Sequence, residues 1–236
     1  MFTFLKDKLK VRVFATAGIF YNSFGVPYSL GKYLQSERDV VLLDIGAHTG
    51  TFTLAVDRMC TVKRGLMVEP QPYHARNLRR AFAEPRFTVV EAALSNWRGR
   101  SDLNIRNFDA TTSLLPIYEE AEELKGTDVG SREIVECAVR TLSDVVQEAA
   151  VPNVDLIKLD VQGAELAVLL GGPEVVRSAR MIWVEVSFKP LYEKSCLFHE
   201  IYDFMHDNGH KLMELESGYR AQSGELIQAD ALFMRR

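Results

Sequence analysis

The chain has 236 residues, of which 47% are apolar and 25% charged, and its formal net charge is −4. This length suits one well-packed domain and is short for two, so a single α/β domain is the default expectation. The acidic balance offers no basic field for nucleic acid, and we expect scattered arginines such as Arg76, Arg79 and Arg80 to form a solvated helix face.

The chain contains three cysteines, Cys60, Cys137 and Cys196, which are widely separated in the sequence. Their odd number and the absence of C-x-x-C or metal-ligand spacing indicate free thiols. Free thiols are typical of a reducing compartment, so we expect a cytoplasmic protein.

Residues 1–38 precede the first expected strand, and we expect them to form an N-terminal helical cap or lid. Their apolar run, Val13 to Phe20, imitates a signal peptide weakly, but Asp7 and the shortness of the run count against one. We prefer a helix packed on the domain, with contact to a membrane surface as the less favoured alternative. No stretch is long enough to span a bilayer.

Four consecutive branched apolar residues, Val40 to Leu43, predict a strand that is buried on both faces, as in the centre of a parallel sheet. Asp44 follows, Gly46 and Gly50 bracket a turn, and apolar residues then recur at helical spacing from Phe52 to Met59. Such a turn predicts nucleotide binding, because glycines let a ligand approach the backbone at the start of a helix.

The spacing of the glycines separates two kinds of cofactor. A dinucleotide-binding fold shows G-x-G-x-x-G, whereas this chain has Asp44-x-Gly46-x-x-x-Gly50 and lacks the middle glycine, which weakens an NAD interpretation. The strand, acid and turn resemble those of Rossmann-like S-adenosylmethionine-dependent methyltransferases, whose acid faces the methionine part of the cofactor. An ordinary βα turn without a ligand is the alternative.

Two further strands are expected to contribute to this site. The second, Gly65 to Val68, ends in Glu69, which lies 25 residues after Asp44 and close to the offset of about 20 residues at which an acid meets ribose hydroxyls. The third, Phe87 to Val90, precedes Glu91 and Ala92, where small residues leave room for an adenine ring and Glu91 is available to its amino edge. The alternative for Glu69 is a surface acid at a turn without a ligand. The alternative for the small residues around Ala92 is that they serve only tight packing.

A polar insertion, residues 107–132, separates two expected strand pieces, Ser101–Arg106 and Ile134–Arg140. Long insertions in compact domains often bind ligands, so we expect a substrate loop. The acidic run between residues 119 and 123 is better explained as a solvated helix face than as a metal site.

Two later strands again carry acids. Val154 to Asp160 ends in Asp160, and Met181 to Val186 places Glu185 near its end. In a parallel sheet the carboxyl ends lie along one edge, so Asp44, Asp160 and Glu185 are expected to converge on one crevice. Two C-terminal strands, Lys211–Leu215 and Gln228–Met234, enclose a turn-rich segment and predict an antiparallel hairpin, which favours a methyltransferase over an NAD-binding domain.

The segments DIGAHTG, VEPQP, EAALSN, IKLDVQGAE, WVEVSFKPLYE and QADALF resemble, in this order, the FkbM family of S-adenosylmethionine-dependent methyltransferases. The resemblance covers about residues 38–235. It implies a Rossmann-like class I fold over residues 39–236, with a mostly parallel seven-stranded sheet, helices on both faces and the hairpin. The family usually has a glutamate where this chain has Gln162, so no charge role is carried over to that position.

The resemblance implies transfer of a methyl group from S-adenosylmethionine to an oxygen, such as a hydroxyl of a saccharide or a secondary metabolite. It also implies a set of cofactor-binding residues: Asp44, Gly46, His48, Thr49 and Gly50 at the methionine end, Glu69 at the ribose, and Glu91 with Ala92 at the adenine.

An alcohol is a poor nucleophile unless its proton leaves, so we expect a general base at the strand ends. Asp160 is the first candidate, Glu185 the second, and His199 on the following helix a weaker third. Structural alternatives for the two acids are a helix cap or an ion pair with Lys158 or Lys189. Mg²⁺ held by Asp160 and Glu185 is a competing mechanism, less favoured because no tight ligand cluster is visible.

Two other functions compete with methyl transfer. One is an NAD- or nucleotide-sugar-dependent oxidoreductase, and the other is a non-catalytic module that keeps the fold for binding. The expected partner is a small hydroxylated acceptor and not a nucleic acid. The sequence does not indicate the identity of the acceptor or the oligomeric state.

Overall fold

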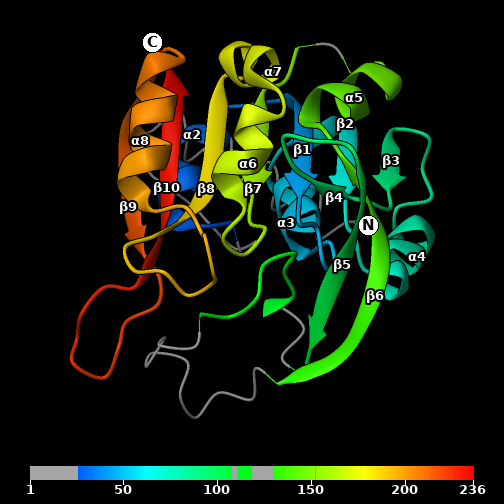
Figure 1. Cartoon of the computed structure of the whole chain (residues 1–236). Helices are drawn as coiled ribbons and strands as arrows, with labels where there is room; N and C mark the ends of the chain where they lie inside the picture. Colours follow the sequence, from blue (N-terminus) through cyan, green and yellow to red (C-terminus); the bar gives the residue numbers. More distant parts are fainter. Residues whose placement is uncertain (1–25, 108–110, 119–129, 152) are drawn as a thin grey trace.

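The computed structural model describes residues 26–107, 111–118, 130–151 and 153–236 (Figure 1). Its main sheet is built from β1 (Asp39–Ile45), β2 (Thr61–Val68), β3 (Phe87–Val90), β7 (Leu156–Leu159), β8 (Met181–Ser187), β9 (His210–Ser217) and β10 (Gln228–Arg235). The strand order is β3-β2-β1-β7-β8-β10-β9. The first five are parallel, while β10 runs antiparallel to both β8 and β9. The predicted seven-stranded, mostly parallel sheet with a C-terminal hairpin is therefore confirmed.

Helices cover both faces of this sheet, as predicted. They are α2 (Tyr28–Leu34), α3 (Thr51–Met59), α4 (Pro72–Ala81), α5 (Leu142–Glu148), α6 (Glu165–Leu170), α7 (Pro173–Ser178) and α8 (Phe198–Asp207). Alternate residues of β1 enter two separate cores because successive side chains of a strand point to opposite faces. Val41 and Leu43 pack with α5 to α8, on the near face in Figure 1, whereas Val40 and Leu42 pack with α2 and α3.

A second, smaller sheet lies beside the main one, in the order β4-β6-β5. It contains β4 (Ala93–Leu94), β5 (Gly99–Arg106) and β6 (Ser131–Arg140), so the two predicted strand pieces pair with each other. The described part of the insertion, residues 111–118, connects this sheet to the loop after β8. Ser113 bridges to Asn104, and Ile117 bridges to Tyr192.

Only part of the predicted N-terminal cap falls within the described residues. Its helix α2 packs on the domain, with Leu30 and Leu34 completely buried, and the amide of Ser29 donates to Glu216 on β9 at 2.9 Å. The cap or lid expected from residues 1–25 lies outside the described residues. In the part of the chain that the structure describes, no helix combines the length and the apolar character needed to cross a membrane.

Candidate functional site

A cavity of about 300 Å³ opens at the carboxyl ends of β1, β2 and β7. This volume is at the lower end of the range for small-molecule sites, about 300 to 1,000 Å³. The turn after β1, the end of β2, the segment around β4, the insertion and the end of β7 all contribute to its wall. The lining includes Gly46, Ala47, His48, Thr51, Glu69, Gln71, Ala92, Ala93, Leu94, Thr112, Ser113, Leu114, Lys158, Asp160 and Gln162.

The turn after β1 requires glycine at residue 46. Gly46 has φ +76°, and a Cβ there would lie 1.9 Å from the backbone oxygen of Asp160. Any side chain would therefore push the end of β1 away from the end of β7. Gly50 has a different role, because a Cβ there would meet Phe82 and Leu78 of the α4 region, at 2.6 and 2.8 Å, and not the cavity.

The backbone donors of the turn are already engaged within the protein. The N–H groups of Gly46 and Ala47 both donate to the carbonyl of Val68, at 3.0 and 3.1 Å, and that of His48 donates to Glu69 at 2.8 Å. His48 stands where a dinucleotide fingerprint has its middle glycine, with φ 49° and its side chain against the cavity. The N–H groups of Gly46, Ala47 and His48 are therefore not free to hold a pyrophosphate.

Glu69 lies at the end of β2, where the sequence predicts a cofactor ligand. It is 3% exposed and lines the cavity. One carboxylate oxygen accepts from His48 N and the other from Gln71 N at 2.9 Å. Burial raises the pKa of Glu69, and the two backbone donors partly oppose that shift. Each oxygen keeps a lone pair for a further donor, so the side chain is oriented to receive a pair of hydroxyls.

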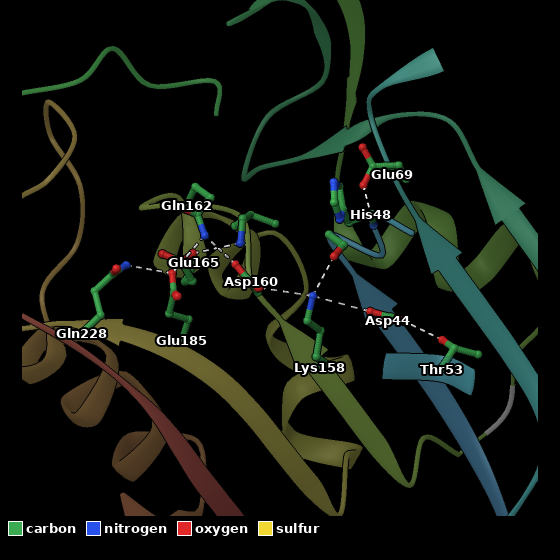
Figure 2. Close-up of polar contacts among 12 residues, drawn as sticks. Asp44, His48, Thr53, Glu69, Lys158, Asp160, Gln162, Glu165, Glu185 and Gln228 are labelled. Carbon is green, nitrogen blue, oxygen red and sulfur yellow. Dashed lines mark hydrogen bonds and ion pairs between the residues drawn. The ribbon is translucent and has the colours of Figure 1, made fainter. Parts of the chain in front are cut away.

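Asp44 does not reach the cavity, which corrects the expectation that it faces the cofactor. Its side chain is fully buried beneath the turn, where one oxygen accepts from Thr53 Oγ1 at 2.6 Å (Figure 2). Asp44 pairs in register with Lys158 on β7, whose Nζ lies 3.7 Å from the other oxygen. Asp44 therefore supports the turn from behind, as the counter-charge of a buried lysine.

Lys158 links the two central strand ends. Its Nζ donates to the carbonyl of Gly46 at 2.6 Å and lies 3.6 Å from Asp160 Oδ2. Burial alone lowers the pKa of Lys158, but the carboxylates of Asp160 and Asp44 and of two more distant acids outweigh it, and the net shift is upward. The lysine stays charged and holds Asp160 at the cavity wall, so the predicted alternative of an ion pair with Lys158 is also realised.

Asp160 and Glu185 come together, as predicted, through the amide of Gln162. Gln162 Nε2 donates to Asp160 Oδ1 at 2.8 Å and to Glu185 Oε2 at 3.2 Å (Figure 2). Of these two acids, only Asp160 lines the cavity. Glu185 lies behind it and also accepts a hydrogen bond from Gln228, at 2.9 Å. Burial, followed by the charge of Asp160, raises the pKa of Glu185 well above its ordinary value.

Three other predicted residues lie away from the cavity. Thr49 is exposed on the outer side of the turn, and Glu91 forms an ion pair with Arg79 at 2.8 Å, so only its neighbour Ala92 contributes to the lining. His199 is exposed on the first turn of α8. Each follows a strand end or a helix start, but the local backbone directs the side chain to solvent.

Several lining residues had no functional assignment from the sequence. The sequence indicates Lys158 only as an ion-pair partner, although a lysine within the buried strand LIKL is a visible signal. Thr51 and Gln71 carried no signal that separates them from ordinary loop or helix residues, whereas Thr112, Ser113 and Leu114 belong to the insertion that the sequence predicts to be a substrate loop. Among the residues that the structure describes, no group of three or more histidine, cysteine or acidic side chains is arranged to hold a metal ion.

Asp230 on β10 lies opposite Glu185 in the register of the sheet. A substitution of Asp230 tests how the buried acids beside the site affect the stability of the fold. Burial, with Asp160 and Glu216, raises its pKa from 3.8 to about 7. The folded state therefore binds more protons than the unfolded chain in this range, and stability falls as the pH rises from about 4 to about 7.

We expect Asp230→Asn to raise the free energy of unfolding by about 1 to 2 kcal/mol at pH 8, after allowance for partial solvent screening, and to change it little at pH 4. Thermal unfolding at both values measures this difference. An equal effect at the two values would show that the carboxylate is not destabilised by the fold.

Comparisons with known proteins agree with this architecture. Residues 44–212, more than half of the chain, match the family described as Methyltransferase FkbM domain. The 2-O-methyltransferase NoeI of Sinorhizobium fredii (strain NBRC 101917 / NGR234) is 29% identical over 180 residues, which cover 73% of this chain and 73% of NoeI. Methyltransferase sdnD of Sordaria araneosa is 30% identical over 156 residues, which cover 56% of this chain and 60% of sdnD.

Among solved structures, Methyltransferase FkbM from Methylobacillus flagellatus KT superposes with a TM-score of 0.56 at 12% identity, covering 96% of this chain and 58% of that one. At this identity the likeness shows the fold alone, and the chain spans little more than half of that protein's length. The family match, which includes both the turn after β1 and the end of β7, carries the assignment. This protein is a methyltransferase of the FkbM family, with the class I methyltransferase fold.

Proposed function

We propose that the protein transfers a methyl group from S-adenosylmethionine to a hydroxyl of a small acceptor, of the saccharide or secondary-metabolite class. The observation that carries this proposal is Glu69, a buried carboxylate at the cavity wall whose two oxygens are both held in place by backbone donors. The relative NoeI is named a 2-O-methyltransferase, which supports oxygen as the acceptor atom.

The residues around the cavity fit S-adenosylmethionine from end to end. Glu69 would accept the ribose hydroxyls, and the small residues Ala92 and Ala93 would border the adenine. Thr51 begins α3, whose first turn has no side-chain cap, so its N–H groups suit the methionine carboxylate. Gly46 lines the cavity and lets the end of β1 lie directly against the end of β7, which would form the wall at the sulfonium end.

When bound, S-adenosylmethionine supplies an activated methyl group on a positively charged sulfur. The chain's main contribution is then to hold an acceptor against that end, and such positioning is worth about 7 to 11 kcal/mol of the barrier. Asp160 Oδ is the group that takes the hydroxyl proton, since it lines the cavity and Lys158 lies 3.6 Å from it. Glu185 is the poorer candidate because it lies behind Asp160 and does not line the cavity.

Titration calorimetry with S-adenosylhomocysteine and with NAD separates this proposal from an oxidoreductase. We expect one molecule of S-adenosylhomocysteine to bind per chain and NAD to give only heats of dilution, because His48 stands in place of the middle glycine that lets a pyrophosphate approach the backbone. The reverse result would overturn the proposal.

Tritiated S-adenosylmethionine with a panel of sugars and hydroxylated natural products then tests turnover. We expect label in an alkali-stable, ether-linked methyl product. Cofactor binding without labelled product from any acceptor in the panel would favour a non-catalytic module.

A further inference from the structure

We propose that Gln162 is a positioning residue, which orients Asp160 and connects it to the insertion and to the loop after β8. The inference rests on the proposed function, in which Asp160 accepts the proton of the acceptor hydroxyl. Gln162 follows β7 by three residues and lines the cavity.

Both polar atoms of the Gln162 side chain are engaged, and their partners come from different parts of the chain. Nε2 donates to Asp160 and to Glu185, at 2.8 and 3.2 Å. Oε1 accepts from the hydroxyl of Tyr192, in the loop after β8, at 2.8 Å. The amide nitrogen has two protons and the two carboxylates take one each. One neutral group thus holds two acids side by side.

Tyr192 determines which way the amide points. Burial raises the pKa of Tyr192, so its hydroxyl keeps its proton and acts as a donor. Its single proton goes to Oε1 at 2.8 Å, a shorter contact than the 3.2 Å to the carbonyl of Thr111. Because Oε1 faces this donor, Nε2 must face the acids.

The backbone of Gln162 completes the connection to the insertion. Its carbonyl accepts from Ser113 Oγ at 2.8 Å, and Ser113 also lines the cavity. The next residue, Gly163, is fixed by the carboxylate of Glu165, which accepts from Gly163 N at 3.1 Å. The insertion and the end of β7 therefore meet at residue 162.

The backbone of Gln162 lies in the left-handed region, with φ 59°. A residue with a Cβ is strained in this region, whereas glycine is not. Strain of this kind persists where the surrounding structure over-determines it, as at functional sites. What glutamine adds over glycine is its side chain, and all of its polar atoms are used to hold the acids and the loops.

Loss of the amide should change the protonation of Asp160. The charged and titratable groups that face it are Lys158 on its own strand, Glu185 on β8, Asp230 on β10, Glu165 on α6 and Tyr192 in the loop after β8. Without the donor at 2.8 Å, Asp160 faces the acids with only Lys158 as a counter-charge. Removal of a hydrogen bond to the charged form raises a carboxyl pKa.

The test compares Gln162→Gly with Ala150→Gly. Ala150 also has a positive φ, 47°, but it lies in the exposed segment after α5. Both substitutions relieve backbone strain, and only the first removes the amide. We expect Gln162→Gly to lower kcat at pH 7 at least tenfold, to move the acid limb of the kcat profile up by about one pH unit, and to leave the affinity for S-adenosylhomocysteine within about threefold. Ala150→Gly should match the wild type in all three.

Gln162→Asn provides the conservative variant, since asparagine tolerates a positive φ and keeps the amide one methylene short. We expect an effect between those of wild type and Gln162→Gly. An unshifted acid limb in both Gln162 variants, or a loss of kcat equal at every pH, would overturn the positioning role and leave only a structural one.

A readout independent of turnover separates failure of this inference from failure of the proposed function. Carbon-13 carboxyl NMR of the S-adenosylhomocysteine complex, with the Asp160 signal assigned through Asp160→Asn, follows the titration of Asp160 directly. Its pKa should be higher in Gln162→Gly than in the wild type. An unchanged titration would refute the inference whether or not the panel contains the true acceptor.

Discussion

Glu69→Ala will weaken binding of S-adenosylhomocysteine by about 100-fold or more. The carboxylate is 3% exposed at the cavity wall, and it is the group that we expect to accept both ribose hydroxyls. Hydrogen bonds to a charged group contribute about 1.5 to 3 kcal/mol each, and every 1.4 kcal/mol changes affinity tenfold. The substitution also leaves the N–H groups of His48 and Gln71 without their acceptor, which loosens the turn that borders the cofactor.

Glu91→Ala is the matched control for this loss. The sequence placed both glutamates at the cofactor, but the structure places Glu91 on the surface in an ion pair with Arg79. Truncation of an exposed ion pair costs little, so its affinity should stay within about twofold of the wild type. Titration calorimetry of both variants decides the question, and equal losses would contradict the assignment of the ribose site to the end of β2.

Asp160→Asn will lower kcat by a factor of about 10² to 10⁴, the usual contribution of a general base, while the affinity for S-adenosylhomocysteine changes by less than about threefold. The amide keeps the shape of the side chain but cannot accept the proton of the acceptor. Since Asp160 lines the cavity beside Lys158, the loss should appear in the methyl-transfer step. Single-turnover measurements with tritiated S-adenosylmethionine isolate that step.

Glu185→Gln distinguishes the two acids that the sequence ranks first and second as the general base. Glu185 lies behind Asp160, where it accepts hydrogen bonds from Gln162 and Gln228, and it does not line the cavity. A glutamine keeps the shape of the side chain, and we expect a loss of kcat below about tenfold. A larger loss in Glu185→Gln than in Asp160→Asn would identify Glu185 as the base.

The order of the elements follows from the sequence alone, and five predicted residues line the cavity: Gly46, His48, Glu69, Ala92 and Asp160. Continuous apolar runs such as Val40 to Leu43 predict strands buried on both faces, and the parallel sheet places their carboxyl ends along one edge. Glu69 and Asp160 come directly after their strands, where a side chain of either orientation stays close to that edge. For this reason a linear pattern was enough to locate both.

Residues inside a strand or beyond a turn could not be placed in this way. Asp44 belongs to β1 itself, and its side chain points to a sheet face, where it meets Lys158 across the strand pair. Thr49 lies within the turn after β1, and Glu91 comes directly after the edge strand β3, so local backbone dihedral angles decide whether each side chain faces the cavity or solvent. His199 depends on the rotation of α8 about its axis. Hydrophobic periodicity does not specify any of these angles.

The sequence by itself therefore determined the class of fold and the sheet edge that carries the site, because burial requires apolar runs of a fixed length and spacing. The family followed separately, from the resemblance of its motifs. Only the tertiary structure decided which groups share the cavity. Lys158, Gln162, Tyr192 and Ser113 come from segments up to 79 residues apart in the chain. They meet because strand register and the left-handed backbone at residue 162 bring their polar atoms within hydrogen-bond or ion-pair distance, and both are properties of the packed chain.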